Sequence, residues 1–242
     1  MHAASQASIV VAAAGVAFFH SVLGPDHYLP FIAMGRSLHW SRTRLAIVTV
    51  LCGLGHVFSS LLLGLLGIAL GFSLIHLQAL EAGRGSWAAW ALIAFGLTYC
   101  LWGVARARRG HAHHHLHWHS DGTAHTHEHA HQQGHLHPHL EDGKQAGWQS
   151  ATPWMLFTIF LLGPCEPMIP LFMYPAASQD WAGAALVAGV FTVVTVATML
   201  AIVLGAEFGL QRVRIPSLEP YSHAIAGATI AICGMAIVGL GV

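Results

Sequence analysis

Two long apolar segments of this chain are interrupted by the same Leu-Gly-Pro tripeptide, and metal-binding side chains follow it in both. The copies read Leu-Gly-Pro-Asp-His at residues 23–27 and Leu-Gly-Pro-Cys-Glu at residues 162–166, an offset of 139 residues. Proline removes a backbone donor and clashes with the preceding helical turn, so each segment should break there. At membrane depth a broken helix is tolerated only where the freed backbone groups face protein or a cavity. The repeated motif therefore predicts two broken membrane spans with a functional site between them.

The composition argues against a soluble domain. Hydrophobic residues make up 55% of the 242 residues and charged residues 8%, with a mean hydropathy of +0.59. Soluble domains carry about 25% charged residues. We therefore expect an all-α integral membrane protein whose constant partner is the lipid bilayer. The formal net charge is zero, so no nucleic-acid partner is expected. The N-terminus lacks the basic region of a signal peptide, so the first apolar run is expected to remain as a span.

Six segments reach the length of about 20 residues that a membrane span needs. They run over residues 8–34, 45–72, 87–105, 152–175, 182–206 and 220–242. Weak matches beyond the two motifs, such as Met34 with Met173, keep the offset of 139. Three spans per half reverse the orientation of the second half, which predicts an inverted repeat. The expected units are a first repeat at 1–105, a loop at 106–151 and a second repeat at 152–242.

Basic residues mark one face of the expected bundle. Nine of the ten Lys and Arg residues fall between spans 1 and 2, 3 and 4, or 5 and 6, and only Arg84 falls on the other side. Loops rich in Lys and Arg stay in the cytoplasm. We therefore expect a multi-pass protein of the inner (plasma) membrane, with both termini outside and the loop at 106–151 inside. The nine residues are Arg36, Arg42, Arg44, Arg106, Arg108, Arg109, Lys144, Arg212 and Arg214.

The loop at 106–151 is rich in histidine. It holds 13 of the chain's 20 histidines, all between His111 and His139. Its low apolar content cannot offset the entropy of ordering, so disorder is expected without metal. Neutral imidazole binds borderline metal ions, so the composition favours metal capture over a merely solvated linker. Whether His2, beside the N-terminal amine, also binds metal stays open.

The first break carries His20, Asp26 and His27. In an unbroken helix the two histidines would share a face but stand about 10 Å apart, too far for one metal ion. A kink at the Gly-Pro step can bring them together, with Asp26 beside them. Because polar side chains at membrane depth must be compensated, three of them around a breaker favour a site over packing. His56, in a Leu-Gly-His sequence followed by two serines, can be either a ligand or a core histidine.

The second break carries Cys165 and Glu166. Pro164 and Pro167 suit the first turn of a new helix, whose dipole would stabilise the Glu166 carboxylate. A thiol beside a carboxylate suits Ni, Co, Zn or Cu rather than Mg or Ca. The other three cysteines form no Cys-x-x-Cys pair and are expected to pack as small buried residues. The predicted metal site consists of His20, Asp26, His27, His56, Cys165 and Glu166.

The motifs around the first break resemble those of the nickel/cobalt transporter family. That family carries a His, a short spacer and Asp-His in one span, followed by a Leu-Gly-His-Ser-type motif in the next. The resemblance covers mainly residues 18–70, and the histidine-rich loop is similar to that of the efflux branch. It implies that His20, Asp26, His27 and His56 are metal ligands or lie on the metal path. The spacer before Asp26 is one residue longer here, and the metal and the direction of transport stay open.

Three functions are compatible with these observations. The first is transport of a divalent transition metal, nickel or cobalt before zinc or copper, with export slightly favoured by the loop. The second is a membrane thiol–disulfide carrier, because the Gly-Pro-Cys-Glu-Pro segment resembles carriers of the cytochrome-c-biogenesis type, although Asp26 stands where those have their first cysteine. The third is a metal-delivery module for metalloenzyme maturation. The transporter interpretation predicts no enzymatic activity and no resident cofactor besides the transported ion, and it leaves a homo-oligomer open.

Overall fold

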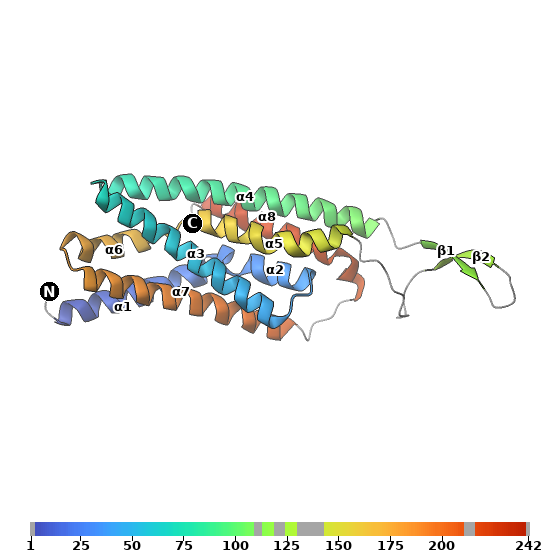
Figure 1. Ribbon diagram of the computed structural model, residues 1–242, viewed down its shortest axis with the longest axis horizontal. Coiled ribbons are helices and arrows are strands. Elements are labelled where there is room, and N and C mark those ends of the chain that lie inside the picture. The colour runs from blue at the N-terminus through green and yellow to red at the C-terminus, as the bar shows by residue number, and fades with distance from the viewer. Residues whose placement is uncertain (1–2, 109–112, 119–123, 130–142, 211–215, 241–242) are drawn as a thin grey trace.

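The computed structural model describes residues 3–108, 113–118, 124–129, 143–210 and 216–240. Long helices lie roughly side by side, and a short hairpin projects from one end of the bundle (Figure 1). The helices and strands are α1 (Ala3–Leu23), η1 (Pro25–His27), α2 (Leu29–Ser37), α3 (Arg42–Ala69), α4 (Leu74–Arg108), β1 (His113–Trp118), β2 (Ala124–His129), α5 (Gly143–Leu162), α6 (Met168–Ala177), α7 (Trp181–Leu210), η2 (Pro216–Tyr221) and α8 (Ser222–Leu240).

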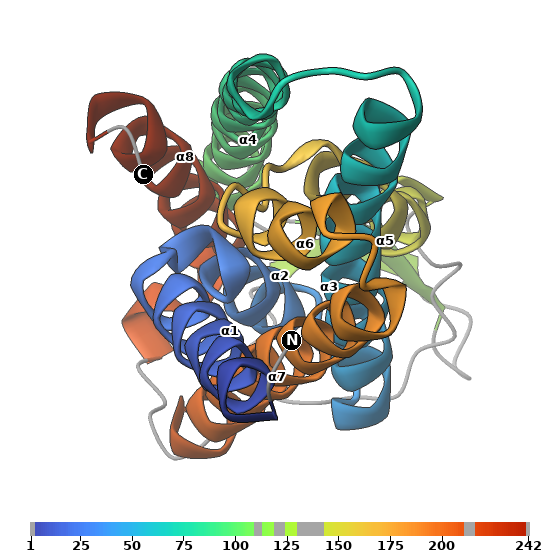
Figure 2. The same ribbon diagram turned by 90° about the vertical axis from the view of Figure 1, so that its left-hand side faces the viewer.

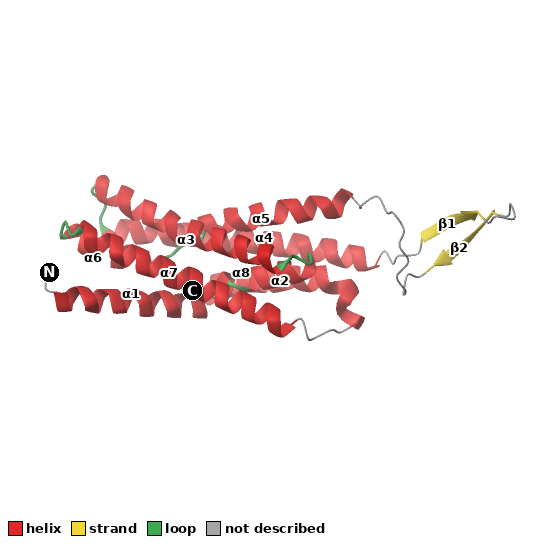
Figure 3. Cartoon of the chain, turned by 60° about the horizontal axis from the view of Figure 1, so that its bottom comes forward, coloured by secondary structure: helices red, strands yellow, loops and turns green. Residues whose placement is uncertain are grey.

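The helical body is that of a membrane-spanning protein. Four helical segments are long and apolar enough to cross a membrane, and the bent pair at the first break can supply a fifth. Large apolar side chains cover its outside; Ile75 is 77% exposed and Trp87 is 76% exposed. Large apolar side chains exposed in this way fit contact with lipid. In the described part of the chain, strands occur only in the hairpin (Figure 3).

The first apolar segment breaks where the Gly-Pro step predicts. α1 ends at Leu23, and the chain turns by 82° before it continues as α2. The backbone groups at the break are paired locally, because the N–H of Gly24 donates to the carbonyl of His20 and the N–H of His27 donates to the carbonyl of Gly24. These two amides are therefore satisfied without solvent, as burial among other helices requires.

The second apolar segment is also broken. α5 ends at Leu162 and α6 begins at Met168, so residues 163–167 form the interruption. α6 contacts α1, α3, α4 and α7, and the view along the bundle shows it in the middle of these helices (Figure 2). The two breaks thus lie inside the bundle.

α2 and α6 end in the same way. Each is followed by a residue in the left-handed region, His39 with φ 53° and Gln179 with φ 60°. In each case the next N–H donates back to a carbonyl of the last turn, Trp40 to Gly35 and Asp180 to Pro175. The next helix then receives a polar N-terminal cap, from Ser41 on α3 and Asp180 on α7.

The third span is longer than hydropathy predicts. We expected residues 87–105, whereas α4 runs from Leu74 to Arg108. Hydropathy missed the first part because Glu81 and Arg84 lower it, yet the two side chains pair with each other and Glu81 is fully buried. Arg84 therefore lies within a helix and not in a loop on the far side of the membrane.

α4 and α8 pack closely through glycines. Gly96 of α4 lies against the backbone of Gly227 and Ala231, and Gly227 of α8 lies against the backbone of Gly96 and Cys100. No side chain separates the two helices at this point, as in the small-residue contacts of other membrane bundles. α4 runs toward the hairpin end, whereas α8 runs away from it (Figure 1).

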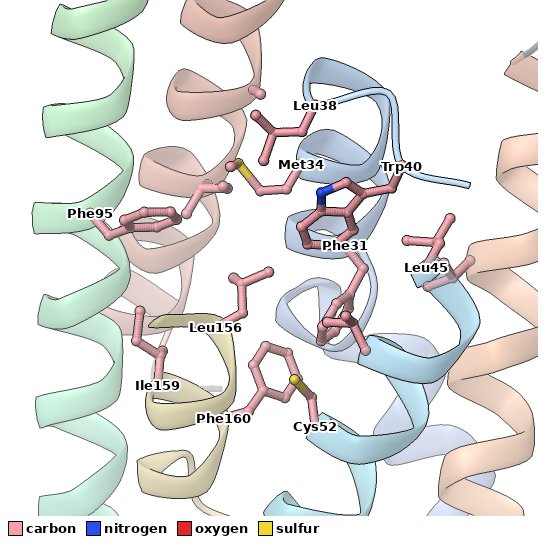
Figure 4. Close-up of a cluster of buried hydrophobic side chains, with 14 of the residues drawn as sticks. Phe31, Met34, Leu38, Trp40, Leu45, Cys52, Phe95, Leu156, Ile159 and Phe160 are labelled. Atoms are coloured by element: carbon pink, nitrogen blue, oxygen red, sulfur yellow. The ribbon is translucent and has the colours of Figure 1, made fainter. Parts of the chain in front are cut away.

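Next to the first break, a hydrophobic cluster joins helices from both halves of the chain. Figure 4 shows Phe31 from α2, Cys52 from α3, Phe95 from α4 and Phe160 from α5 around a common interior. Phe31 and Phe160 are in direct contact, with ring centroids 4.7 Å apart. This cluster fixes the last turn of α5 against α2 and α3, and with it the start of the second break.

The histidine-rich loop contains an antiparallel hairpin where composition predicts disorder. Its register pairs His113 with His129, His115 with His127, and His117 with His125. The helices on either side end at Arg108 and begin at Gly143. Residues 109–112, 119–123 and 130–142 lie outside the described part of the chain, as do His2, Arg109, Arg212 and Arg214.

Candidate metal site

The first break brings His20 and His27 together. Their ring centroids are 4.7 Å apart, against the roughly 10 Å of axial rise that seven residues of straight helix would put between them. A side chain at Gly24 would prevent this arrangement, since an added Cβ would lie 2.5 Å from Nδ1 of His27. The glycine is therefore needed for space.

His56 completes a cluster of three imidazoles. It lies on α3, and its ring centroid is 5.0 Å from that of His27 and 6.2 Å from that of His20. Each of the three residues offers one nitrogen, and these nitrogens lie within 4.8 Å of one another. His27 and His56 are each only 2% exposed. Of the two roles open for His56, its position favours that of a ligand.

The hydrogen bonds of His27 and His56 define which nitrogen is free. Nδ1 of His27 lies 3.2 Å from the carbonyl oxygen of Gly24, and Nδ1 of His56 lies 3.3 Å from that of Phe160. A carbonyl only accepts, so both Nδ1 atoms carry the proton and both Nε2 atoms expose a lone pair. Both Nε2 atoms are buried and have no hydrogen-bond partner among the described residues. This is the arrangement that metal-binding histidines adopt, with the other ring nitrogen held by an oxygen.

Asp26 lies beside the cluster and orients it. Its Oδ1 is 3.2 Å from Nδ1 of His27, and its side chain is 26% exposed. A carboxylate on the far nitrogen of a ligating histidine fixes the ring and raises its basicity. Asp26 was predicted to be a metal ligand beside His27. In the structure its carboxylate contacts Nδ1 of His27, the ring nitrogen that does not face the cluster.

The second break places the thiol of Cys165 beside His20. Sγ of Cys165 lies 3.9 Å from Nε2 of His20, and Cys165 is fully buried. Glu166, the next residue, is exposed. Glu166 does not belong to the imidazole cluster, but it lines a cavity that His20, His27 and His56 also line. Of the two predicted ligands at this break, the structure brings Cys165 beside His20, although not into the cluster of three imidazoles, and leaves Glu166 at the cavity wall.

A cavity of about 600 Å³ adjoins the cluster. Apolar residues of α1 and α4 form much of its wall. Its polar lining comes from both breaks and from α3, namely His20, Asp26, His27, His56 and Glu166. A few polar groups converging in an apolar cavity are typical of a binding site.

Sequence reasoning missed Glu81 and Arg84. Their side chains form an ion pair on α4, and Oε2 of Glu81 accepts hydrogen bonds from Ser60 Oγ and from the backbone N–H of Cys165. A Glu and an Arg three positions apart in an apolar stretch form an i,i+3 pair, and this spacing was the available signal.

The three remaining histidines outside the loop and the N-terminus do not join the site. They are His39, His76 and His223. His223, the second residue of α8, is buried, and its Nδ1 lies 2.7 Å from the hydroxyl of Tyr99 on α4. That hydroxyl also lies 3.3 Å from Ser37 Oγ on α2. These contacts tie α2, α4 and α8 together.

No family model, no curated protein and no solved structure matches this chain.

Proposed function

We propose that this protein transports a divalent transition-metal ion across the membrane, nickel or cobalt in preference to zinc or copper. The proposal is carried by the buried Nε2 atoms of His27 and His56, which have no hydrogen-bond partner in the described part of the chain and cluster with His20. An unpaired polar group inside a membrane bundle is expensive unless it has a ligand. Three neutral imidazoles and a thiol form a donor set for borderline metals.

The break geometry supports a transport role. Both broken spans meet at the candidate site, where Cys165 of one approaches His20 of the other. Discontinuous helices around a central binding site are characteristic of secondary transporters. The unwound segments can change their backbone conformation more readily than a continuous helix, so the site can open to either side.

An inverted repeat of three spans and three is part of the proposal. Its support is the repeated Leu-Gly-Pro motif, the matched ends of α2 and α6, and the opposite directions of α4 and α8. In this arrangement α1 and α2 correspond to α5 and α6, α3 to α7, and α4 to α8. Transport would follow from rocking of one repeat against the other.

We propose an inner (plasma) membrane location with the histidine-rich loop in the cytoplasm. Arg36, Arg42, Arg44 and Arg106 belong to the helix ends nearest the hairpin, so the excess of basic residues marks that end as cytoplasmic. A cytoplasmic loop able to collect metal ions favours export. The alternative is a metal-delivery role, in which the loop binds metal and the protein moves none across the membrane. A flux measurement distinguishes the two.

The decisive experiment is metal flux into proteoliposomes, comparing Ni, Co, Zn, Cu and Mn. We expect saturable flux that is highest for Ni or Co and is lost in the His56→Ala variant. Purified protein that is monodisperse and correctly inserted, yet moves none of the five ions, would overturn the proposal. Unchanged flux in the His56→Ala variant would show that the transported ion binds at another site.

A further inference from the structure

Glu81 is a fully buried carboxylate in a helix long enough to span the membrane. Placing a charge there is costly unless it is paired and hydrogen-bonded. The metal site described above does not use it. Its only charged partner among the described residues is Arg84, one turn further along α4. Stability alone does not account for such a pair, because a protein with apolar residues in its place is often at least as stable.

Arg84 holds the end of α5. Its Nη2 donates to the carbonyl oxygens of Leu161 at 2.9 Å and Gly163 at 3.3 Å, and to Ser59 Oγ at 2.7 Å. The last carbonyls of a helix have no partner within the helix. A guanidinium from α4 therefore caps the end at which the second span breaks, and it cross-links this end to α3.

Glu81 holds the next part of the break. Its Oε2 accepts from the backbone N–H of Cys165 at 3.1 Å and from Ser60 Oγ at 3.0 Å. The same N–H lies 3.1 Å from Ser60 Oγ. Pro164 packs directly on Gly85, where an added Cβ would lie 2.7 Å from the proline ring. Four of the five residues from 161 to 165, all except Leu162, thus contact side chains or the backbone of α4.

This attachment places the Cys165 thiol at a metal-ligand separation from His20. Two ligands of a tetrahedral site, with metal–sulfur bonds of about 2.3 Å and metal–nitrogen bonds of about 2.1 Å, lie about 3.6 Å apart. The observed distance from Sγ to Nε2 of His20 is 3.9 Å. The Glu81–Arg84 pair is neutral as a unit, so it fixes the backbone without adding net charge beside the metal.

We propose that Glu81, acting with Ser60 and Arg84, is a positioning residue that holds the second break so that the Cys165 thiolate becomes the fourth metal ligand, beside His20, His27 and His56. The inference rests on the proposed function and deepens it. On binding, the sulfur–metal bond forms and the thiol proton leaves to solvent. A ligand set of three imidazoles and one thiolate favours metals with affinity for sulfur.

The test is optical spectroscopy of the full-length protein in nanodiscs titrated with Co(II). Cobalt bound to a thiolate shows sulfur-to-metal charge-transfer absorption in the near ultraviolet, and cobalt bound to imidazole alone does not. The histidine-rich loop contains no cysteine, so its imidazoles do not contribute to this band. We expect the band in the wild-type protein and its loss in the Cys165→Ser variant.

The variants Glu81→Gln and Ser60→Ala separate positioning from packing. Both should lose most of the band and bind cobalt about 10- to 100-fold more weakly at the site, while visible absorption from cobalt on the three histidines remains. Glu219→Gln, at an exposed residue of η2, is the charge-matched control and should leave the spectrum unchanged. If Glu81→Gln does not insert stably, Ser60→Ala decides, because it keeps the ion pair.

A double exchange, Glu81→Arg with Arg84→Glu, restores an ion pair but removes the carboxylate from Cys165. We expect it to leave the charge-transfer band absent, whereas a restored band would show that the pair only stabilises the helix.

Wild-type intensity in folded Glu81→Gln or Ser60→Ala protein would overturn the inference. Cobalt binding by the wild-type protein without a sulfur band would also overturn it and leave the transport proposal standing. Absence of both binding and flux would instead count against the transport proposal.

Discussion

Sγ of Cys165 lies 3.9 Å from Nε2 of His20, although 145 positions separate the two residues in the chain. Each residue belongs to one of the two broken segments. Their proximity means that the two Leu-Gly-Pro motifs contribute to one site. A metal ion bound there would connect the two halves of the chain, so its affinity should depend on how the halves are placed relative to each other.

The His27→Ala variant should abolish transport while the protein still inserts. It removes one nitrogen from the cluster and also the partner of Asp26. Metal flux in proteoliposomes at matched protein amounts is the measurement. Asp26→Ala should also stop flux, whereas Asp26→Asn should weaken metal affinity about 10- to 100-fold because it only loosens the orientation of the His27 ring. Unaltered flux in the His27→Ala variant would refute the site.

Gly24→Ala should disrupt the site without removing a ligand. The added methyl group would lie 2.5 Å from Nδ1 of His27, so the ring must move. We expect metal affinity, measured by calorimetry with the purified protein, to fall at least about tenfold, as for other changes that disturb a ligating histidine. Gly189→Ala is the matched control, because a Cβ there meets nothing within 4 Å. Equal affinities of the two variants would contradict the proposed role of Gly24.

Gly96→Ala should destabilise the bundle. The new methyl group would clash with the backbone of Ala231 and Gly227 on α8, and backbone cannot move aside as a flexible side chain can. We expect a loss of about 1–3 kcal/mol, typical of overpacking, seen as a lower unfolding midpoint in detergent. Gly205→Ala, in open space on α7, should leave the midpoint nearly unchanged. If both variants unfold together, the close contact between α4 and α8 is not a stabilising one.

Deleting residues 111–139 should lower transport at low metal concentration and leave the maximal rate. A tethered set of imidazoles raises the local concentration of metal, but the buried cluster is a separate part of the molecule. Since imidazole binds metal only when neutral, the difference between full-length and deleted protein should shrink as pH falls through about 6.5. Flux against concentration at one pH above and one below that value tests this. Loss of flux at saturating metal would make the loop part of the pathway.

The breaks and the positions of most apolar helices could be predicted from local sequence. Pro25 and Pro164 each interrupt an apolar run, and proline acts on its own helix turn whatever surrounds it. The start of α4 could not be predicted, because Glu81 and Arg84 look too polar for a span until their pairing is known. Similarly, Asp26 and Glu166 were predicted as ligands from their residue types and their places beside the breaks. Only the fold shows one behind a histidine and the other at a cavity wall.

The amino-acid sequence by itself determined that this protein is a helical membrane protein with two interrupted apolar segments, because hydropathy and proline act locally. It also determined which residue types stand at the breaks. The tertiary structure alone decided which of them meet. His56 joins His20 and His27 because α3 packs beside the first break, and Cys165 lies near His20 in a second break that is hydrogen-bonded to Glu81 and Arg84. Contacts between residues so distant in the chain depend on helix packing, which local patterns do not encode.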